Sequence, residues 1–158
     1  MDNQKPANQL RFLNRLYSII FFSYIIFLIL SSLVVSNAGP LLQEDPGLFT
    51  IIKSIAIGFP IILIPIAYTW PQRKIKAIDE SSPLEEKMIF YRKALSLRLL
   101  LILVVALAVS FIFMLIGDTN LIMVLAIVLL FLVLSRPTPF KVATDLGLSD
   151  QEKLELMK

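Results

Sequence analysis

Few side chains in the long apolar segments of this sequence could take part in chemistry. Lys53 is the one ionisable residue that lies well inside such a segment. Charge inside a membrane is costly and often functional, so Lys53 could bind an anion or act as a gating charge. Alternatively, its ammonium group can return to the membrane surface, because Lys53 lies only about five residues, or roughly 7–8 Å, into the segment. We favour this second interpretation.

The same segment holds Ser54, Gly58, Pro60 and Pro65, which could interrupt or bend a helix. Transporters use such broken helices to present carbonyl groups to a substrate. Glycine and proline are also frequent in ordinary membrane helices, and a simple packing kink is the favoured interpretation. Together with Lys53, these four residues form the one candidate substrate or gating site that the sequence indicates.

The composition of the chain argues against catalysis. There is no cysteine and no histidine, which removes thiol chemistry and the commonest metal ligand and acid–base group. No Asp or Glu lies within the apolar segments, so the buried acid of small proton-coupled transporters is missing. The five glycines form no phosphate-binding loop. We therefore expect no enzymatic activity, no cofactor and no metal site.

Four apolar segments must position the candidate residues. Hydrophobic residues make up 57% of the 158, against about 45–50% in soluble domains. A helix needs about 20 apolar residues to cross a membrane, and the alternation typical of membrane strands is missing. The sequence predicts an all-α membrane protein, a four-transmembrane-helix bundle, with spans at about 16–35, 48–70, 99–116 and 119–135. Residues 1–135 form the transmembrane domain, and residues 136–158 form a C-terminal tail.

Turn and capping signals predict the ends of several helices. Residues 82–85 match a capping box with Pro83 at the first helical position, which predicts a long helix running through Arg98 into span three. This helix would give span three a cytoplasmic helical extension. Residues 117–120 predict a tight hairpin between spans three and four.

The tail contains its own helix signals. Arg136 and Pro137 should end span four, and Thr138 with Pro139 can begin a short helix that Gly147 ends. Ser149, followed by Glu152, forms a second capping box that opens a last helix to Met157.

Basic residues are distributed unevenly between the connections. Of the fifteen Lys and Arg residues, all but Lys53 lie before span one, between spans two and three, or after span four. The other two connections contain Glu44, Asp45 and Asp118. Cytoplasmic loops carry an excess of Lys and Arg, which predicts cytoplasmic termini in a multi-pass protein of a bacterial inner (plasma) membrane. The first apolar stretch exceeds the roughly 7–15 residues of a signal peptide, and we expect it to be retained.

Tyrosines and the one tryptophan supply the remaining polar groups of interest. Tyr24 lies in the middle of span one, where its hydroxyl needs a partner, and an interhelical hydrogen bond is favoured over a substrate contact. Tyr17, Tyr68 and Trp70 lie near the predicted cytoplasmic boundary and are typical of an aromatic belt.

Two hypotheses of function follow. The favoured one is a non-catalytic structural or accessory subunit, whose spans pack against other membrane subunits or copies of itself and whose extension and tail dock a partner. The alternative is a small homo-oligomeric transporter or channel that uses the kinked span two with Lys53.

Acidic residues such as Asp79 and Glu80 dilute the basic residues of region 73–93, so a topology signal explains that region better than binding of anionic lipid does. The sequence contains no stacking motif that would indicate binding of nucleic acid.

Overall fold

The computed structural model describes residues 5–42, 46–78 and 82–157, and the regular structure of these residues is entirely helical. Four of the acidic residues considered above lie outside the described residues: Glu44, Asp45, Asp79 and Glu80. The predicted all-α class is confirmed. The helices in chain order are α1 (Pro6–Ala38), α2 (Pro46–Lys76), α3 (Leu84–Ile116), α4 (Asn120–Leu134), α5 (Pro139–Leu146) and α6 (Asp150–Met157).

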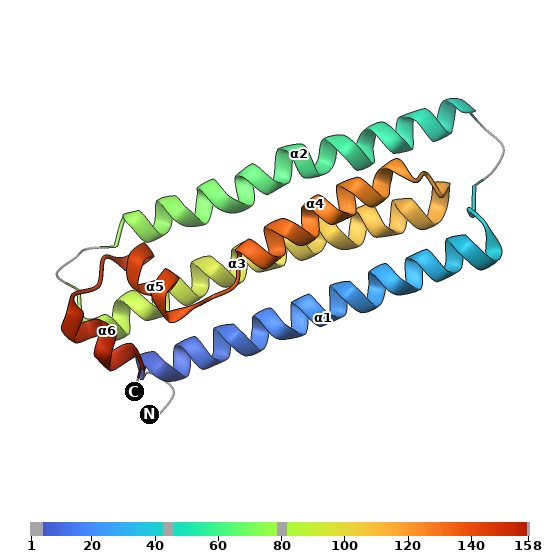
Figure 1. Ribbon diagram of the computed structural model, residues 1–158. Helices are drawn as coiled ribbons and strands as arrows, with labels where there is room; N and C mark the ends of the chain where they lie inside the picture. The colour runs from blue at the N-terminus through green and yellow to red at the C-terminus, as the bar shows by residue number, and fades with distance from the viewer. Residues whose placement is uncertain (1–4, 43–45, 79–81, 158) are drawn as a thin grey trace.

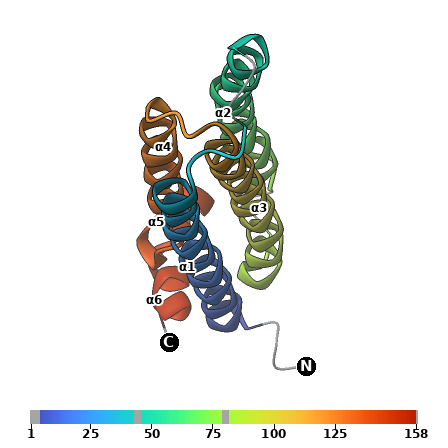
Figure 2. The ribbon, with the colours of Figure 1, turned by 90° about the vertical axis from the view of Figure 1, so that its right-hand side faces the viewer.

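The long helices lie side by side, with α1 and α2 both packed on α3 and with α4 folded back along α3 (Figure 1). Both ends of the chain lie at one end of this bundle, which we call the termini end. The opposite end, the loop end, holds the chain that leaves α1 and the α3–α4 hairpin (Figure 2).

Three helices, α1, α2 and α3, are long and apolar enough to cross a membrane. The fourth candidate is a bent pair, in which α4 is followed by α5 at an angle of 77°. The 15 residues of α4 would rise by roughly 22 Å, which is less than the ~30 Å of a bilayer core. The described residues therefore form a helical membrane protein with three to four candidate spans.

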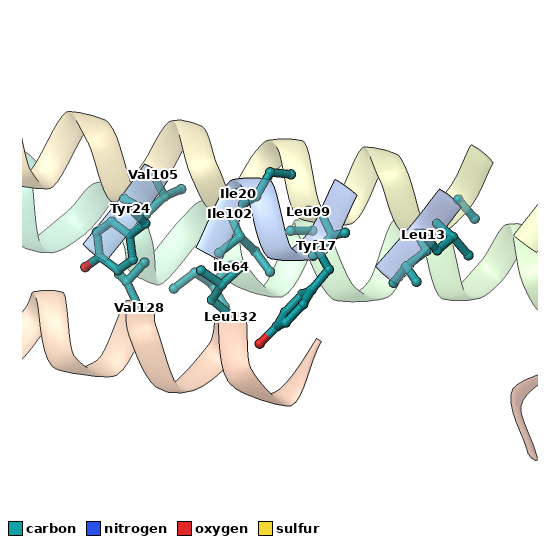
Figure 3. Close-up of a cluster of buried hydrophobic side chains, with 14 of the residues drawn as sticks. Leu13, Tyr17, Ile20, Tyr24, Ile64, Leu99, Ile102, Val105, Val128 and Leu132 are labelled. Carbon is teal, nitrogen blue, oxygen red and sulfur yellow. The ribbon is translucent and has the colours of Figure 1, made fainter. Parts of the chain in front are cut away.

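A seven-residue repeat explains why α3 lies at the centre. Met88, Leu95, Ile102, Val109 and Ile116 are all buried. Residues seven apart lie on one face of a helix and pack into neighbours that cross at about 20°. Figure 3 shows the middle of this interface, where α3 residues lie close to α1, α2 and α4. The labelled side chains are Leu13, Tyr17, Ile20, Tyr24, Ile64, Leu99, Ile102, Val105, Val128 and Leu132.

The predicted hairpin between α3 and α4 is confirmed, and Gly117 explains how it closes. Gly117 has a φ of +64°, and a Cβ atom there would lie 3.1 Å from the Cβ of Pro40. Only glycine combines this left-handed backbone with so close an approach. The chain after α1 packs here, because Leu41 and Leu42 donate backbone hydrogen bonds to the carbonyls of Met114 and Leu115.

The start of α3 differs from its prediction by one residue. Pro83 is the N-cap in extended conformation (φ −57°, ψ 146°), and no side chain caps the helix, so the capping box at Ser82 is wrong. The reason is that Pro83 rather than Ser82 occupies the N-cap position, with its carbonyl accepting hydrogen bonds from the Glu86 and Lys87 N–H groups, and a proline has no side-chain acceptor to cap the helix. From Leu84 onward, the predicted continuous helix through Arg98 is confirmed.

The predicted tail helices are both confirmed. The Thr138 hydroxyl accepts a hydrogen bond from the Lys141 N–H at 3.2 Å, and Gly147 ends α5 in the left-handed conformation. At α6, a carboxylate oxygen of Glu152 accepts hydrogen bonds from the Ser149 N–H at 2.8 Å and from its hydroxyl at 2.9 Å. Local capping chemistry therefore sets the shape of the tail.

Tyr24 forms the interhelical hydrogen bond that its position predicts. Its side chain is fully buried, and its hydroxyl donates to the Leu125 carbonyl of α4 at 2.9 Å. We expect Tyr24→Phe to lower the free energy of unfolding by about 0.6 kcal/mol, because this is the mean value of such bonds in membrane bundles. Unfolding in mixed micelles of a mild detergent and dodecyl sulfate measures it, with exposed Ser23→Ala as the control. An unchanged unfolding midpoint for Tyr24→Phe would contradict the assignment.

Candidate functional site

The five residues predicted as a substrate or gating site lie along α2 without meeting at one point. Ser54 and Pro65 are exposed, whereas Pro60 is buried. The Ser54 hydroxyl donates to the Thr50 carbonyl of its own helix at 2.8 Å. Gly58 makes no close contact with another helix, since a Cβ atom there would meet nothing within 4 Å. The helix is unbroken from Pro46 to Lys76, and the role of these residues in transport stays a prediction.

Lys53 lies at the loop end, where its ammonium group forms an ion pair with Asp118 of the α3–α4 hairpin. The other carboxylate oxygen of Asp118 accepts hydrogen bonds from the backbone and side-chain nitrogens of Asn120, both at 2.8 Å. Asp118 therefore shapes the hairpin and neutralises Lys53. The ion pair joins α2 to α3 and α4, which gives Lys53 a structural role at this end.

A double-mutant cycle tests the ion pair. Lys53→Met and Asp118→Asn should each lower the free energy of unfolding, and the double variant should lose less than the sum, with a coupling of about 0.5–1 kcal/mol. Asparagine keeps an oxygen for the Asn120 hydrogen bonds, so Asp118→Asn chiefly removes the charge. Unfolding in mixed micelles at low and high salt provides the measurement. Strictly additive effects that do not change with salt would contradict the pair.

The most unusual group in the described residues is Arg98, which is 3% exposed and lies near the middle of α3, beside Tyr68 of α2. One guanidinium nitrogen donates to the Gln72 side-chain oxygen at 2.9 Å and to the Tyr68 carbonyl at 3.5 Å. The guanidinium also lies 4.7 Å from the centre of the Tyr68 ring. Its Nε has no hydrogen-bond partner, and no carboxylate of the described residues lies within ion-pair distance. Arg98 is therefore a buried cation without a direct counter-charge.

Tyr68 connects this cation to α4. Its hydroxyl oxygen lies 2.7 Å from that of Ser135 and donates to the Phe131 carbonyl at 2.8 Å. Its ring meets the Phe131 ring edge to face. Tyr68 is thus half-buried between α2, α3 and α4, and its prediction as an aromatic-belt residue did not include this polar cluster. Trp70, two residues on, is exposed, in keeping with a belt position.

The tail packs against the bundle, with α5 on α2 and α6 on α1, and two hydrogen bonds join it to the first turns of α3. Tyr91 donates to a carboxylate oxygen of Asp145 in α5 at 3.0 Å, and Lys87 donates to Glu152 of α6 at 3.1 Å. Between these contacts lie buried apolar side chains, including Met88 and Leu156. The tail is consequently a packed part of the fold, and we call it, with the first turns of α3, the platform.

No known protein family, curated protein or solved structure matches this chain. Within residues 5–42, 46–78 and 82–157, no group of three or more His, Cys, Asp or Glu side chains is arranged to hold a metal ion. Three features of the described residues bear on function. They are the apolar bundle, the Lys53–Asp118 ion pair at its loop end, and the polar cluster of Arg98, Tyr68 and Ser135 with the platform beyond it.

The hold of α6 on the platform should weaken in acid. Hydrogen bonds from the Ser149 backbone and then its side chain, followed by the Lys87 contact, lower the pKa of Glu152 despite partial burial. A lowered folded-state pKa adds stability above the unfolded value of about 4.3, and this stability is lost as the pH falls through the folded value.

We therefore expect Glu152→Gln to reduce the hydrogen-exchange protection of α6 at neutral pH and to reduce it less at an acid pH below the unfolded value of about 4.3. Comparing the two proteins at each pH cancels the intrinsic pH dependence of exchange. Exposed Glu86→Gln is the control. An equal difference between wild type and Glu152→Gln at both pH values would refute the linkage.

Proposed function

We propose that this chain is a non-catalytic accessory or structural subunit of a membrane complex, anchored by four transmembrane helices with both termini in the cytoplasm. The observation that carries the proposal is the stripe of buried apolar residues, seven apart, that runs along α3 from Met88 to Ile116. The one cation inside a predicted apolar segment, Lys53, is paired with Asp118 at the loop end. An interior of this kind supports anchoring rather than an aqueous path through a single copy.

The course of the chain supports four crossings. Helix α1 begins and α6 ends at the termini end, so the chain has to return through α4 after α3 (Figure 1). Apart from Lys53, the described Lys and Arg residues also lie in the parts of the chain on the termini side of the bundle. Because cytoplasmic segments are rich in Lys and Arg, we assign the termini end to the cytoplasm. The short α4 can be accommodated by local bilayer thinning.

The platform supports a docking role at the cytoplasmic face. Its tail is fixed by the Tyr91–Asp145 and Lys87–Glu152 contacts, so it presents a constant surface. Leu154 of α6 is 64% exposed on that surface, although it lies outside the long apolar helices. A rigid exposed leucine can insert into an apolar pocket of a partner protein, because burying its side chain away from water is favourable.

Purification from the native membrane tests the proposal. We expect the tagged protein, expressed at its natural level and purified in mild detergent, to bring stoichiometric partner subunits that mass spectrometry identifies. Leu154→Glu should reduce recovery of those partners at least tenfold, because it places a charge in the contact. Gln151→Glu adds the same charge to an exposed position of α6 and is the matched control.

Two outcomes would count against the proposal. A protein that purifies alone as a defined oligomer would favour the transporter hypothesis, and flux into liposomes that Lys53→Met abolishes would establish it. Partners that Leu154→Glu still retains in full would remove the platform from the contact.

A further inference from the structure

An apolar groove of about 350 Å³ runs between α2 and α4. Pro60, Ile61 and Ile64 of α2 line one side, and Val124 and Ile127 of α4 line the other. Ile61 is 66% exposed and Ile127 is 51% exposed, so the groove opens outward, toward the lipid of a surrounding bilayer. Its wall offers almost no polar atoms, which suits hydrocarbon.

The length of the groove matches one leaflet. Its lining on α2 extends from Ile57 to Tyr68. At 1.5 Å per residue this distance is roughly 17 Å, close to half of the ~30 Å hydrocarbon core. Tyr68 marks the end of the groove nearest the termini end, where its hydroxyl meets Ser135 at the last turn of α4. An acyl chain in the groove would therefore place its head group just beyond Tyr68.

Positive charge gathers at that end of the groove. The Arg98 guanidinium lies against the Tyr68 ring with its Nε unpaired, and the Lys141 ammonium donates to the Leu134 carbonyl at the end of α4. An ammonium group has three donors, so Lys141 keeps two for another acceptor. The Asp145 carboxylate, which interacts electrostatically with Lys141, is engaged by the Tyr91 hydroxyl. Two cations thus face one carboxylate.

We propose that the α2–α4 groove binds one acyl chain of an anionic phospholipid, whose phosphate lies at Lys141, while the buried Arg98 adds positive charge behind the Tyr68 ring. Phosphate oxygens are acceptors for the free donors of the Lys141 ammonium group. Basic pockets between transmembrane helices on the cytoplasmic side bind such head groups. The site is distinct from the basic residues of region 73–93, because a groove and a buried cation define it. It does not depend on whether the chain is an accessory subunit.

Native mass spectrometry of the purified, delipidated protein tests the proposal. The probe is an equimolar mixture of phosphatidylglycerol and phosphatidylcholine with equal acyl chains. The wild type should retain one phosphatidylglycerol in preference to phosphatidylcholine. Lys141→Gln should lower that preference about fivefold, the effect of one cation near a head group. Lys153→Gln on α6 is the matched loss of charge away from the groove.

A second pair of variants tests the groove itself. Ile127→Trp should fill it and reduce retention of both lipids, whereas Ile122→Trp, on a comparably exposed α4 residue outside the groove lining, should leave retention unchanged. Equal retention of the two lipids by the wild type would overturn the proposal. So would a preference that Lys141→Gln and Lys153→Gln reduce alike, or retention that Ile127→Trp leaves intact. These readouts need no folded Arg98 variant and no partner protein.

Discussion

The packing of α3 is the constraint on which the rest of this structure depends. Lipid tails are as apolar as leucine, so helices in a membrane associate through close packing and interhelical hydrogen bonds rather than through exclusion of water. The seven-residue stripe of α3 gives α1, α2 and α4 one common surface to pack on. Gly117 then returns the chain so closely that α4 lies on this surface too. The fold is in this sense one central helix and three that lie along it.

A second stripe of α3 contains Leu84, Tyr91, Arg98 and Val105, also seven residues apart and all buried. Two of its members are polar, and they lie where the bundle passes from apolar core to platform. Burying a cation is costly unless it is paired and hydrogen-bonded. Arg98 is stabilised by the Tyr68 ring, in a contact worth about 2 kcal/mol when desolvated, and by Gln72. Arg98 thereby joins α2 to α3, and Tyr68 extends the connection to α4.

The parts of the fold that the sequence predicted correctly are those decided by nearby residues. The hairpin at Gly117 and both tail helices depend on partners within a few residues, such as Ser149 and Glu152. The same approach misplaced the start of α3 by one residue, because Pro83 rather than Ser82 takes the N-cap position. Arg98 was predicted to lie in the helix that leads into span three, but only as one of the basic residues between spans two and three. Its distance of seven residues from Tyr91 and Val105 was a usable signal that it faces the core.

Contacts between distant residues could not be predicted in this way. Lys53 and Asp118 meet only because α2 and the α3–α4 hairpin reach the loop end at the same height, a result of helix lengths and packing. The tail was expected to dock a partner, and its sequence gave no indication of which helices it packs against. In the structure α5 packs against α2 and α6 against α1, and Tyr91 of α3 donates a hydrogen bond to Asp145.

The short α4 links these observations. A helix of 15 residues leaves its last carbonyls in or near the hydrocarbon, where unpaired backbone groups cost several kcal/mol each. Here the Tyr68 and Ser135 hydroxyls reach the Phe131 carbonyl, and Lys141 reaches the Leu134 carbonyl. These partners come from α2, from the end of α4 itself and from α5. The polar cluster therefore has a structural reason to exist, because it ends a helix that is too short to reach water alone.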